Sequence, residues 1–224
     1  MARFVLLNEK NRDRYLRIIT PVGKFFARTG IHPNTLSITG LILSAAAGFI
    51  YSSGAFFWAA WVVIAAGICD TLDGLIARQA KKTSIFGAFF DSTLDRYSDM
   101  FFFLGLAYYF SGGTNPLMDH NPQVHGGTHP WTVLILFLAV TGSFMVSYAR
   151  ARAEGLGIEC RGGMMQRPER MVLLIIGSLL GGLPGFGEIL MKGTLLILAI
   201  STHLTAVHRI IAVRNQMLKE NKTK

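Results

Sequence analysis

The sequence predicts an all-α integral membrane protein with six transmembrane helices, an N-terminal interfacial amphipathic helix before the first of them, and both termini in the cytoplasm. Three observations predict this fold class. Of the 224 residues, 51% are hydrophobic and only 16% are charged, whereas about 25% of the residues of a soluble domain are charged. Residues 29–69 form a run of 41 residues without a charge, and about 20 suffice to cross a bilayer as a helix. The basic residues are also unevenly distributed along the chain.

Charged and turn-forming residues divide the chain into six apolar segments. The expected spans are about 35–52, 55–77, 84–110, 131–151, 171–183 and 189–213. The whole chain, 1–224, is expected to form a single membrane domain. It would consist of a cytoplasmic or interfacial N-terminal segment (about 1–33), a six-helix bundle (about 34–213) and a cytoplasmic tail (214–224).

The basic residues indicate the orientation of this bundle. Of the 22 Lys and Arg residues, all except Arg96 and Lys192 fall in segments that an even number of spans places on one side. Positively charged loops mark the cytoplasmic side, so we expect a multi-pass protein of the cell (plasma) membrane in which these segments, and a functional site near them, face the cytoplasm. The basic excess then attracts anionic lipid headgroups and requires no nucleic acid. In residues 12–28, apolar side chains alternate with basic ones, as in an interfacial amphipathic helix.

Five acidic residues lie inside the expected spans. Asp70 and Asp73 are three residues apart in the second span, and Asp91, Asp95 and Asp99 are spaced by four in the third. Each charge at a bilayer centre costs about 2.5–3.5 kcal/mol on insertion scales, so a compensating charge is expected. The spacings place each set on one face of a helix, and the short loop between the spans makes them antiparallel neighbours.

The two sets of carboxylates are therefore expected to meet near the cytoplasmic ends of their helices. A site of carboxylate oxygens without Cys or His suits Mg²⁺ or Mn²⁺ rather than Zn²⁺. Because Mg²⁺ is commonly held by carboxylates together with substrate phosphates, a pyrophosphate is the natural ligand. A carboxylate not fully engaged with metal would then be available as a general base.

The spacing of these residues carries a family resemblance. It reads Asp70-x2-Asp73-Gly74-x2-Ala77-Arg78-x8-Gly87-x3-Asp91-x3-Asp95. This pattern resembles the signature of the CDP-alcohol phosphotransferase family at every position. The resemblance implies that an acceptor hydroxyl attacks the β-phosphate of a CDP-linked alcohol and releases CMP. It implies two divalent ions, Mg²⁺ or Mn²⁺, with Asp70, Asp73, Asp91 and Asp95 as metal ligands and Asp95 also as the catalytic base.

The resemblance further implies a site for the donor, CDP-diacylglycerol or a related CDP-lipid. Its expected residues are Pro33, Asn34, Thr35, Gly74, Arg78, Thr83 and Ser84. Gly74 would let the nucleotide approach the helix backbone, and Arg78 would contact phosphate. Pro-Asn-Thr is, however, also a common start of a helix.

The loop between the fourth and fifth spans is rich in arginine. Its five basic residues are Arg150, Arg152, Arg161, Arg167 and Arg170, and Arg offers the bidentate geometry that phosphate monoesters favour. The stretch resembles the branch of the family that forms phosphatidylinositol phosphate or its archaeal ether-lipid counterpart.

That resemblance implies a phosphorylated polyol acceptor, inositol phosphate, bound by Arg150, Arg152, Arg167 and Arg170. The position of Arg150 is Lys in some relatives, so glycerol 3-phosphate or another polar alcohol remains an alternative acceptor.

Other expectations concern the function class and assembly. A cation transporter or channel is the alternative from a different class, since ion pathways also use intramembrane acids. The acids stop at one membrane face, however, which favours the enzyme. Asp99 is expected to pair with Arg96 or to line the acceptor pocket. The resemblance also suggests a homodimer.

Overall fold

The computed structural model describes residues 17, 20, 21, 32–79, 84–113, 128–160 and 163–223. Within these residues the chain is helical, without strands. The long helices are α2 (Pro33–Ser52), α3 (Phe56–Gln79), α4 (Ile85–Phe110), α5 (Pro130–Gly155), α6 (Arg167–Gly181) and α7 (Gly187–Thr223). The bounds of α2 to α6 follow the expected apolar segments to within about four residues. The last helix differs: α7 continues ten residues past the expected end at residue 213, so the segment 214–223, expected as a tail, is helical. The amphipathic helix expected at residues 12–28 falls almost entirely outside the described residues.

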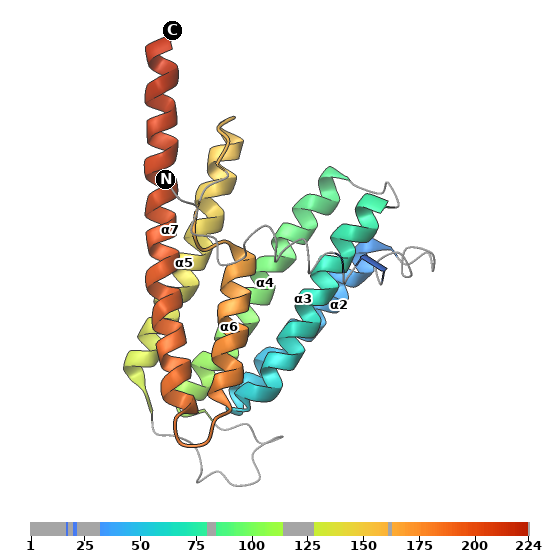
Figure 1. Cartoon of the computed structure of the whole chain (residues 1–224), viewed down its shortest axis with the longest axis vertical. Coiled ribbons are helices and arrows are strands. Elements are labelled where there is room, and N and C mark those ends of the chain that lie inside the picture. Colours follow the sequence, from blue (N-terminus) through green and yellow to red (C-terminus); the bar gives the residue numbers. More distant parts are fainter. Residues whose placement is uncertain are drawn as a thin grey trace.

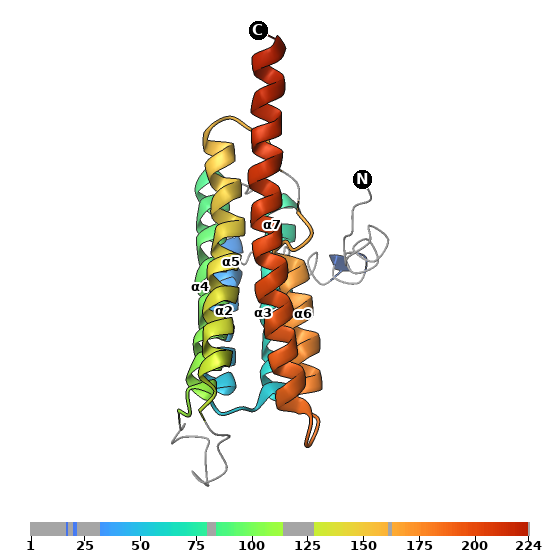
Figure 2. The ribbon, with the colours of Figure 1, turned by 90° about the vertical axis from the view of Figure 1, so that its left-hand side faces the viewer.

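The helices run up and down between two ends of a bundle (Figure 1). Going around the bundle, α2 packs against α3, α3 against α6, α6 against α7, α7 against α5, α5 against α4, and α4 against α2. Figure 2 shows the same helices from the side, with α7 extending beyond the others at one end. That end, which also holds the starts of α2, α4 and α6, is called the site end below.

Local sequence explains where several helices begin. Pro33, Pro130 and Pro168 occupy the first turns of α2, α5 and α6, where the missing amide hydrogen removes no helical bond. Before α4, the Ser84 hydroxyl accepts a hydrogen bond from the Gly87 amide at 2.9 Å, which satisfies one free donor of the first turn.

Four of these helices, α2, α3, α5 and α7, are long and apolar enough to cross a membrane. The other two are less clear by the same measures, because α6 has only 15 residues and the first half of α4 carries several charges. The chain is therefore an all-helical, multi-pass membrane protein.

Two glycines bring α2 and α4 into backbone contact. A Cβ atom added at Gly105 would collide with the backbone of Gly48, and one added at Gly48 would collide with the carbonyl of Phe101. Small residues at such positions allow helices in a membrane to approach closely. The first half of α4, which carries Asp91 and Asp95, is thereby held against α2. Helices α3 and α4, expected as direct neighbours, instead both pack on α2, which lies between them.

The opposite end of the bundle is closed by aromatic packing. Tyr51, Phe56, Phe102 and Phe110 are almost completely buried there, with neighbouring rings 6.1–6.5 Å apart. The Tyr51 hydroxyl shares a 2.6 Å hydrogen bond with the Ser178 hydroxyl on α6. This end of the bundle is thus tightly packed and largely apolar, in contrast to the site end.

Replacing Gly105 by Ala should lower stability, because the new methyl group must force α2 and α4 apart. Overpacking of this kind costs about 1–3 kcal/mol. Gly193→Ala is the matched control, since a Cβ there meets nothing within 4 Å and Ala favours a helix by up to about 1 kcal/mol. Thermal unfolding in detergent measures both; equal behaviour of the two variants would contradict the close contact.

Candidate active site

Three carboxylates from two helices converge at the site end. Asp70 on α3 and Asp91 and Asp95 on α4 each offer an oxygen, and these oxygens lie within 4.8 Å of one another. All three residues are half-buried. All three ligands are carboxylate oxygens, which are the ligands that Mg²⁺ and Mn²⁺ favour. The structure thus brings together three of the four expected metal ligands.

The fourth expected ligand, Asp73, lies apart from this group. Its side chain is buried, with 5% of its surface exposed, and its Oδ2 accepts a 2.5 Å hydrogen bond from the Ser37 hydroxyl on α2. Ser37 stands one turn after Pro33, so the start of α2 contacts the carboxylate side of α3 directly. Asp73 joins α2 to the helix that supplies Asp70.

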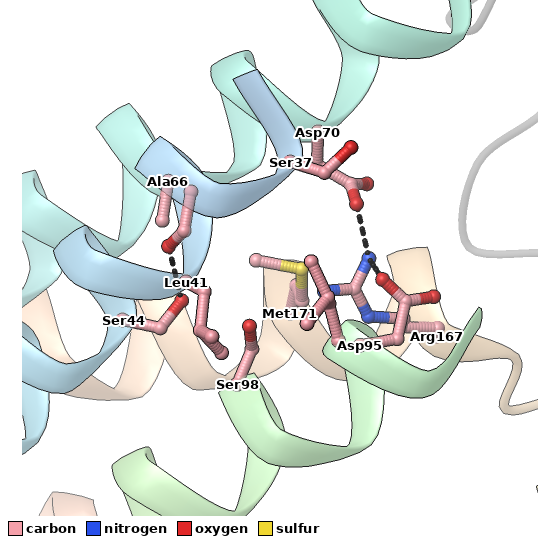
Figure 3. A pocket seen from close by; sticks show the side chains of 11 residues that line it. Ser37, Leu41, Ser44, Ala66, Asp70, Asp95, Ser98, Arg167 and Met171 are labelled. Atoms are coloured by element: carbon pink, nitrogen blue, oxygen red, sulfur yellow. Dashed lines mark hydrogen bonds and ion pairs between the residues drawn. The ribbon is translucent and has the colours of Figure 1, made fainter. Parts of the chain in front are cut away.

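An arginine lies inside the acidic cluster. The Nη1 atom of Arg167, the first residue of α6, is 2.8 Å from Oδ1 of Asp70 and 2.8 Å from Oδ1 of Asp95. Figure 3 shows the guanidinium between the two carboxylates. Arg167 was expected to bind the acceptor phosphate; in the structure it supplies the compensating charge that the buried acids require.

A second ion pair lies deeper in the bundle. Nη2 of Arg170 is 3.0 Å from Oδ2 of Asp99, and both side chains are almost fully buried. Oδ1 of Asp99 is 3.9 Å from Nε of Arg167, so Asp99 connects the two arginines of α6. Arg96 lies beside Asp95, at 3.8 Å, and its guanidinium donates to the carbonyl of Ser92.

The residues expected to bind the donor surround the same end of α3. The guanidinium of Arg78 folds back over Gly74, where a Cβ atom would meet its Nη1 at 3.3 Å. The Asn34 amide donates to Nδ1 of His32 at 3.2 Å, so this stretch caps α2. The Ser84 hydroxyl caps α4, and Thr83 lies outside the described residues. Among the described contacts, the hydrogen bond from Ser37 to Asp73 is the one that connects the start of α2 to an expected metal ligand.

The remaining expected acceptor residues, Arg150 and Arg152, lie near the end of α5. Nε of Arg150 forms an exposed 2.8 Å ion pair with Glu154, one turn along the helix. Arg152 is exposed. The structure therefore brings Arg167 and Arg170 to the acids and leaves these two arginines at the surface.

A pocket opens beside the cluster between α2, α3, α4 and α6 (Figure 3). Its polar lining consists of Ser37, Ser44, Asp70, Asp95, Ser98 and Arg167. Sequence reasoning missed the serines, Ser37 above all. The signal was available, because Ser37 lies one helical turn from Pro33 in a segment already singled out, and α2 must pack beside α3.

Comparison with known proteins agrees with this site. Residues 30–207 match the model of the family described as CDP-alcohol phosphatidyltransferase. A phosphatidylinositol phosphate synthase of Streptomyces avermitilis is 32% identical over 217 residues, covering 94% of this chain and 84% of the relative. An archaetidylinositol phosphate synthase of Methanothermobacter thermautotrophicus is 35% identical over 199 residues, covering 88% of this chain and 89% of the relative.

Solved structures agree as well. The phosphatidylinositol phosphate synthase of Mycobacterium tuberculosis with CDP-DAG bound aligns with a TM-score of 0.74 and 29% identity, covering 88% of this chain and 94% of that one. The same enzyme with manganese and citrate aligns with a TM-score of 0.72 and 28% identity, covering 87% of this chain and 88% of that one. The converging carboxylates and these likenesses together show that the chain is a membrane enzyme of the CDP-alcohol phosphatidyltransferase family.

Proposed function

We propose that the enzyme transfers the phosphatidyl group, or its ether-lipid equivalent, from a CDP-linked lipid to a hydroxyl of inositol phosphate. The acceptor oxygen forms a bond to the β-phosphorus, the bond from that phosphorus to the bridging diphosphate oxygen breaks, and CMP leaves with the bonding electrons. The observation that carries the proposal is the cluster of Asp70, Asp91 and Asp95 with Arg167 and Arg170 at its edge. Two relatives named for inositol phosphate products support the choice of acceptor.

Asp70, Asp91 and Asp95 would hold two Mg²⁺ or Mn²⁺ ions, with Asp73 as a further ligand. Bound divalent ions supply charge stabilisation for the diphosphate and the departing CMP. The carboxylate chemistry of the cluster fits such ions, and a relative's structure contains manganese. The Ser37 hydroxyl donates to Oδ2 of Asp73, and a carboxylate that accepts one hydrogen bond still has lone pairs with which to bind a metal.

The protein's own groups perform the remaining steps. Asp95 accepts the proton from the acceptor hydroxyl at a carboxylate oxygen, as a general base positioned on a rigid helix. On the donor side, CDP-lipid would lie along α3 above Gly74, with Arg78 moved onto the diphosphate and the segment Pro33–Thr35 and Ser84 beside the nucleotide. Thr83 belongs to the same proposed subsite.

The acceptor's phosphate is proposed to bind Arg150, Arg152, Arg167 and Arg170. Arg170 is held by Asp99, which fixes the direction of its guanidinium. Guanidinium groups from α5 and α6 would then surround a dianionic phosphate with paired donors. Free alcohols would need fewer cations, so this proposal favours a phosphorylated acceptor.

The membrane arrangement is proposed to include all six helices as spans, with both termini and the site end in the cytoplasm and the protein in the plasma membrane as a homodimer. The positions of Lys and Arg along the chain support this orientation,. The charged face of α4 would be shielded from lipid by α2, against which α4 packs, and by the ion pairs with α6.

The choice of acceptor can be tested with purified enzyme, labelled CDP-diacylglycerol, Mn²⁺ and one acceptor at a time. We expect CMP release with inositol phosphate and little with glycerol 3-phosphate, inositol or serine. Release with glycerol 3-phosphate alone would replace the proposed acceptor. Absence of release with every acceptor, together with ion flux in proteoliposomes, would reject the proposed reaction.

Exchanging single carboxylates should separate their roles. Asp95→Asn is expected to lower kcat by at least about 100-fold, the scale of general base catalysis, while CDP-lipid still binds. Asp70→Asn should weaken the metal-dependent binding of CDP-lipid instead. Equilibrium binding and initial rates measure both variants; equal nucleotide affinity of the two would contradict the division of roles.

Arg152→Ala tests the acceptor site at an exposed residue whose loss should not disturb the fold. A lost charge-assisted contact is worth about 1.5–3 kcal/mol, so the KM for the phosphorylated acceptor should rise more than tenfold while the KM for CDP-lipid changes little. Arg214→Ala, also exposed, is the control. An unchanged KM for the acceptor would contradict a contact between Arg152 and the phosphate, and the positive charge would then serve only the orientation of the protein in the membrane.

A further inference from the structure

The arginine in the acidic cluster bridges two of the carboxylates that are proposed to hold a divalent cation. Nη1 of Arg167 is 2.8 Å from one oxygen of Asp70 and 2.8 Å from one oxygen of Asp95, and these two residues belong to the trio whose oxygens lie within 4.8 Å of one another. A guanidinium and a divalent ion cannot both lie between the same oxygens, because they would collide and repel each other. A divalent ion bound at these two oxygens would therefore have to displace the guanidinium.

Arg167 holds the two carboxylates through only one of its three nitrogens. Both short contacts are made by the same nitrogen, Nη1, whereas a guanidinium binds a carboxylate best through two parallel bonds. Its buried Nε has no hydrogen-bond partner and faces Oδ1 of Asp99 at 3.9 Å. Asp99 therefore offers a second anchor for the guanidinium after it leaves Asp70 and Asp95.

We propose that Arg167 is an internal counter-ion that exchanges with the divalent cation, so that the same arginine balances Asp70 and Asp95 without metal and becomes free to bind the acceptor phosphate with metal. The proposal rests on the acceptor site proposed above. Without an exchange, the arginine would stay neutralised by two carboxylates and would offer little attraction to a phosphate.

The exchange makes metal binding and phosphate binding cooperative. Metal at the carboxylates releases Arg167 and so tightens phosphate binding, and phosphate held by Arg167 removes a competitor and so tightens metal binding by the same factor. The enzyme would thus avoid capturing a phosphorylated acceptor before the ions that activate the donor are in place.

The test is a Mn²⁺ titration of the purified enzyme, followed by the electron paramagnetic resonance of free Mn²⁺. Arg167→Ala should bind Mn²⁺ about 10- to 100-fold more tightly than the wild type, within the usual range of coupling between sites. Arg96→Ala is the matched control, because it removes an equal charge 3.8 Å from Asp95 without vacating the space between the carboxylates. It should change the affinity by less than about threefold.

The same proteins give a second readout with inorganic phosphate as the probe. In the wild type, Mn²⁺ should tighten phosphate binding measured by calorimetry, and Arg167→Ala should lose most of that dependence. In chelator, Arg167→Ala should unfold at a lower temperature than the wild type, and Mn²⁺ should restore it, because the carboxylates regain a cation.

Three results would overturn the exchange. The first is unchanged or weaker Mn²⁺ binding by Arg167→Ala, and the second is an equal increase of Mn²⁺ affinity in Arg96→Ala. The third is a phosphate affinity of the wild type that does not depend on Mn²⁺. Arg167→Lys covers the case in which the alanine variant does not fold, because its shorter, single-headed cation should give a Mn²⁺ affinity between the other two. These measurements do not use turnover, so a wrong acceptor identity and a wrong exchange are distinguished.

Discussion

The structure depends on the charge balance of carboxylates within an apolar helix bundle. Asp70, Asp95 and Asp99 are each within 4 Å of a guanidinium from α6. Uncompensated, such acids are costly among helices that face lipid. The ion pairs therefore determine where the start of α6 must lie, and they link α3, α4 and α6 at the end that holds the candidate active site. The same carboxylates and guanidinium groups thus stabilise the bundle and form the candidate site.

The precision of the site rests on packing some distance from it. The backbone contact of Gly48 with Gly105 and the hydrogen bond between Tyr51 and Ser178 lie toward the opposite end, in the tightly packed part of the bundle. Rigid helices transmit this spacing along their length, so the carboxylates of α3 and α4 meet at a defined distance. The site end can then carry polar side chains while the helices keep their relative positions.

Much of this arrangement could be predicted from the sequence, since gaps between charges define the helices and spacings of three and four place the acids on common faces. The partners of those acids could not. Whether Arg167 reaches Asp70 or solvent depends on how α6 packs against α3, and the bond from Ser37 to Asp73 depends on the rotation of α2. Both are tertiary relations between segments 36 to 97 residues apart, which local periodicity does not encode. The serines of the pocket were missed for the same reason.

The lengths of α3 and α4 also indicate how deep the carboxylates lie in the membrane. From Phe56, Asp70 lies 14 residues along α3, and from Phe110, Asp91 lies 19 residues back along α4; at 1.5 Å per residue these are rises of about 21 and 28 Å. With the aromatic end at one boundary of a hydrocarbon core about 30 Å thick, Asp91 would lie close to the other boundary and Asp70 about 9 Å inside it. The headgroup of a membrane lipid lies at this boundary while its acyl chains stay within the hydrocarbon core. The enzyme can therefore work on a lipid without lifting it from the membrane.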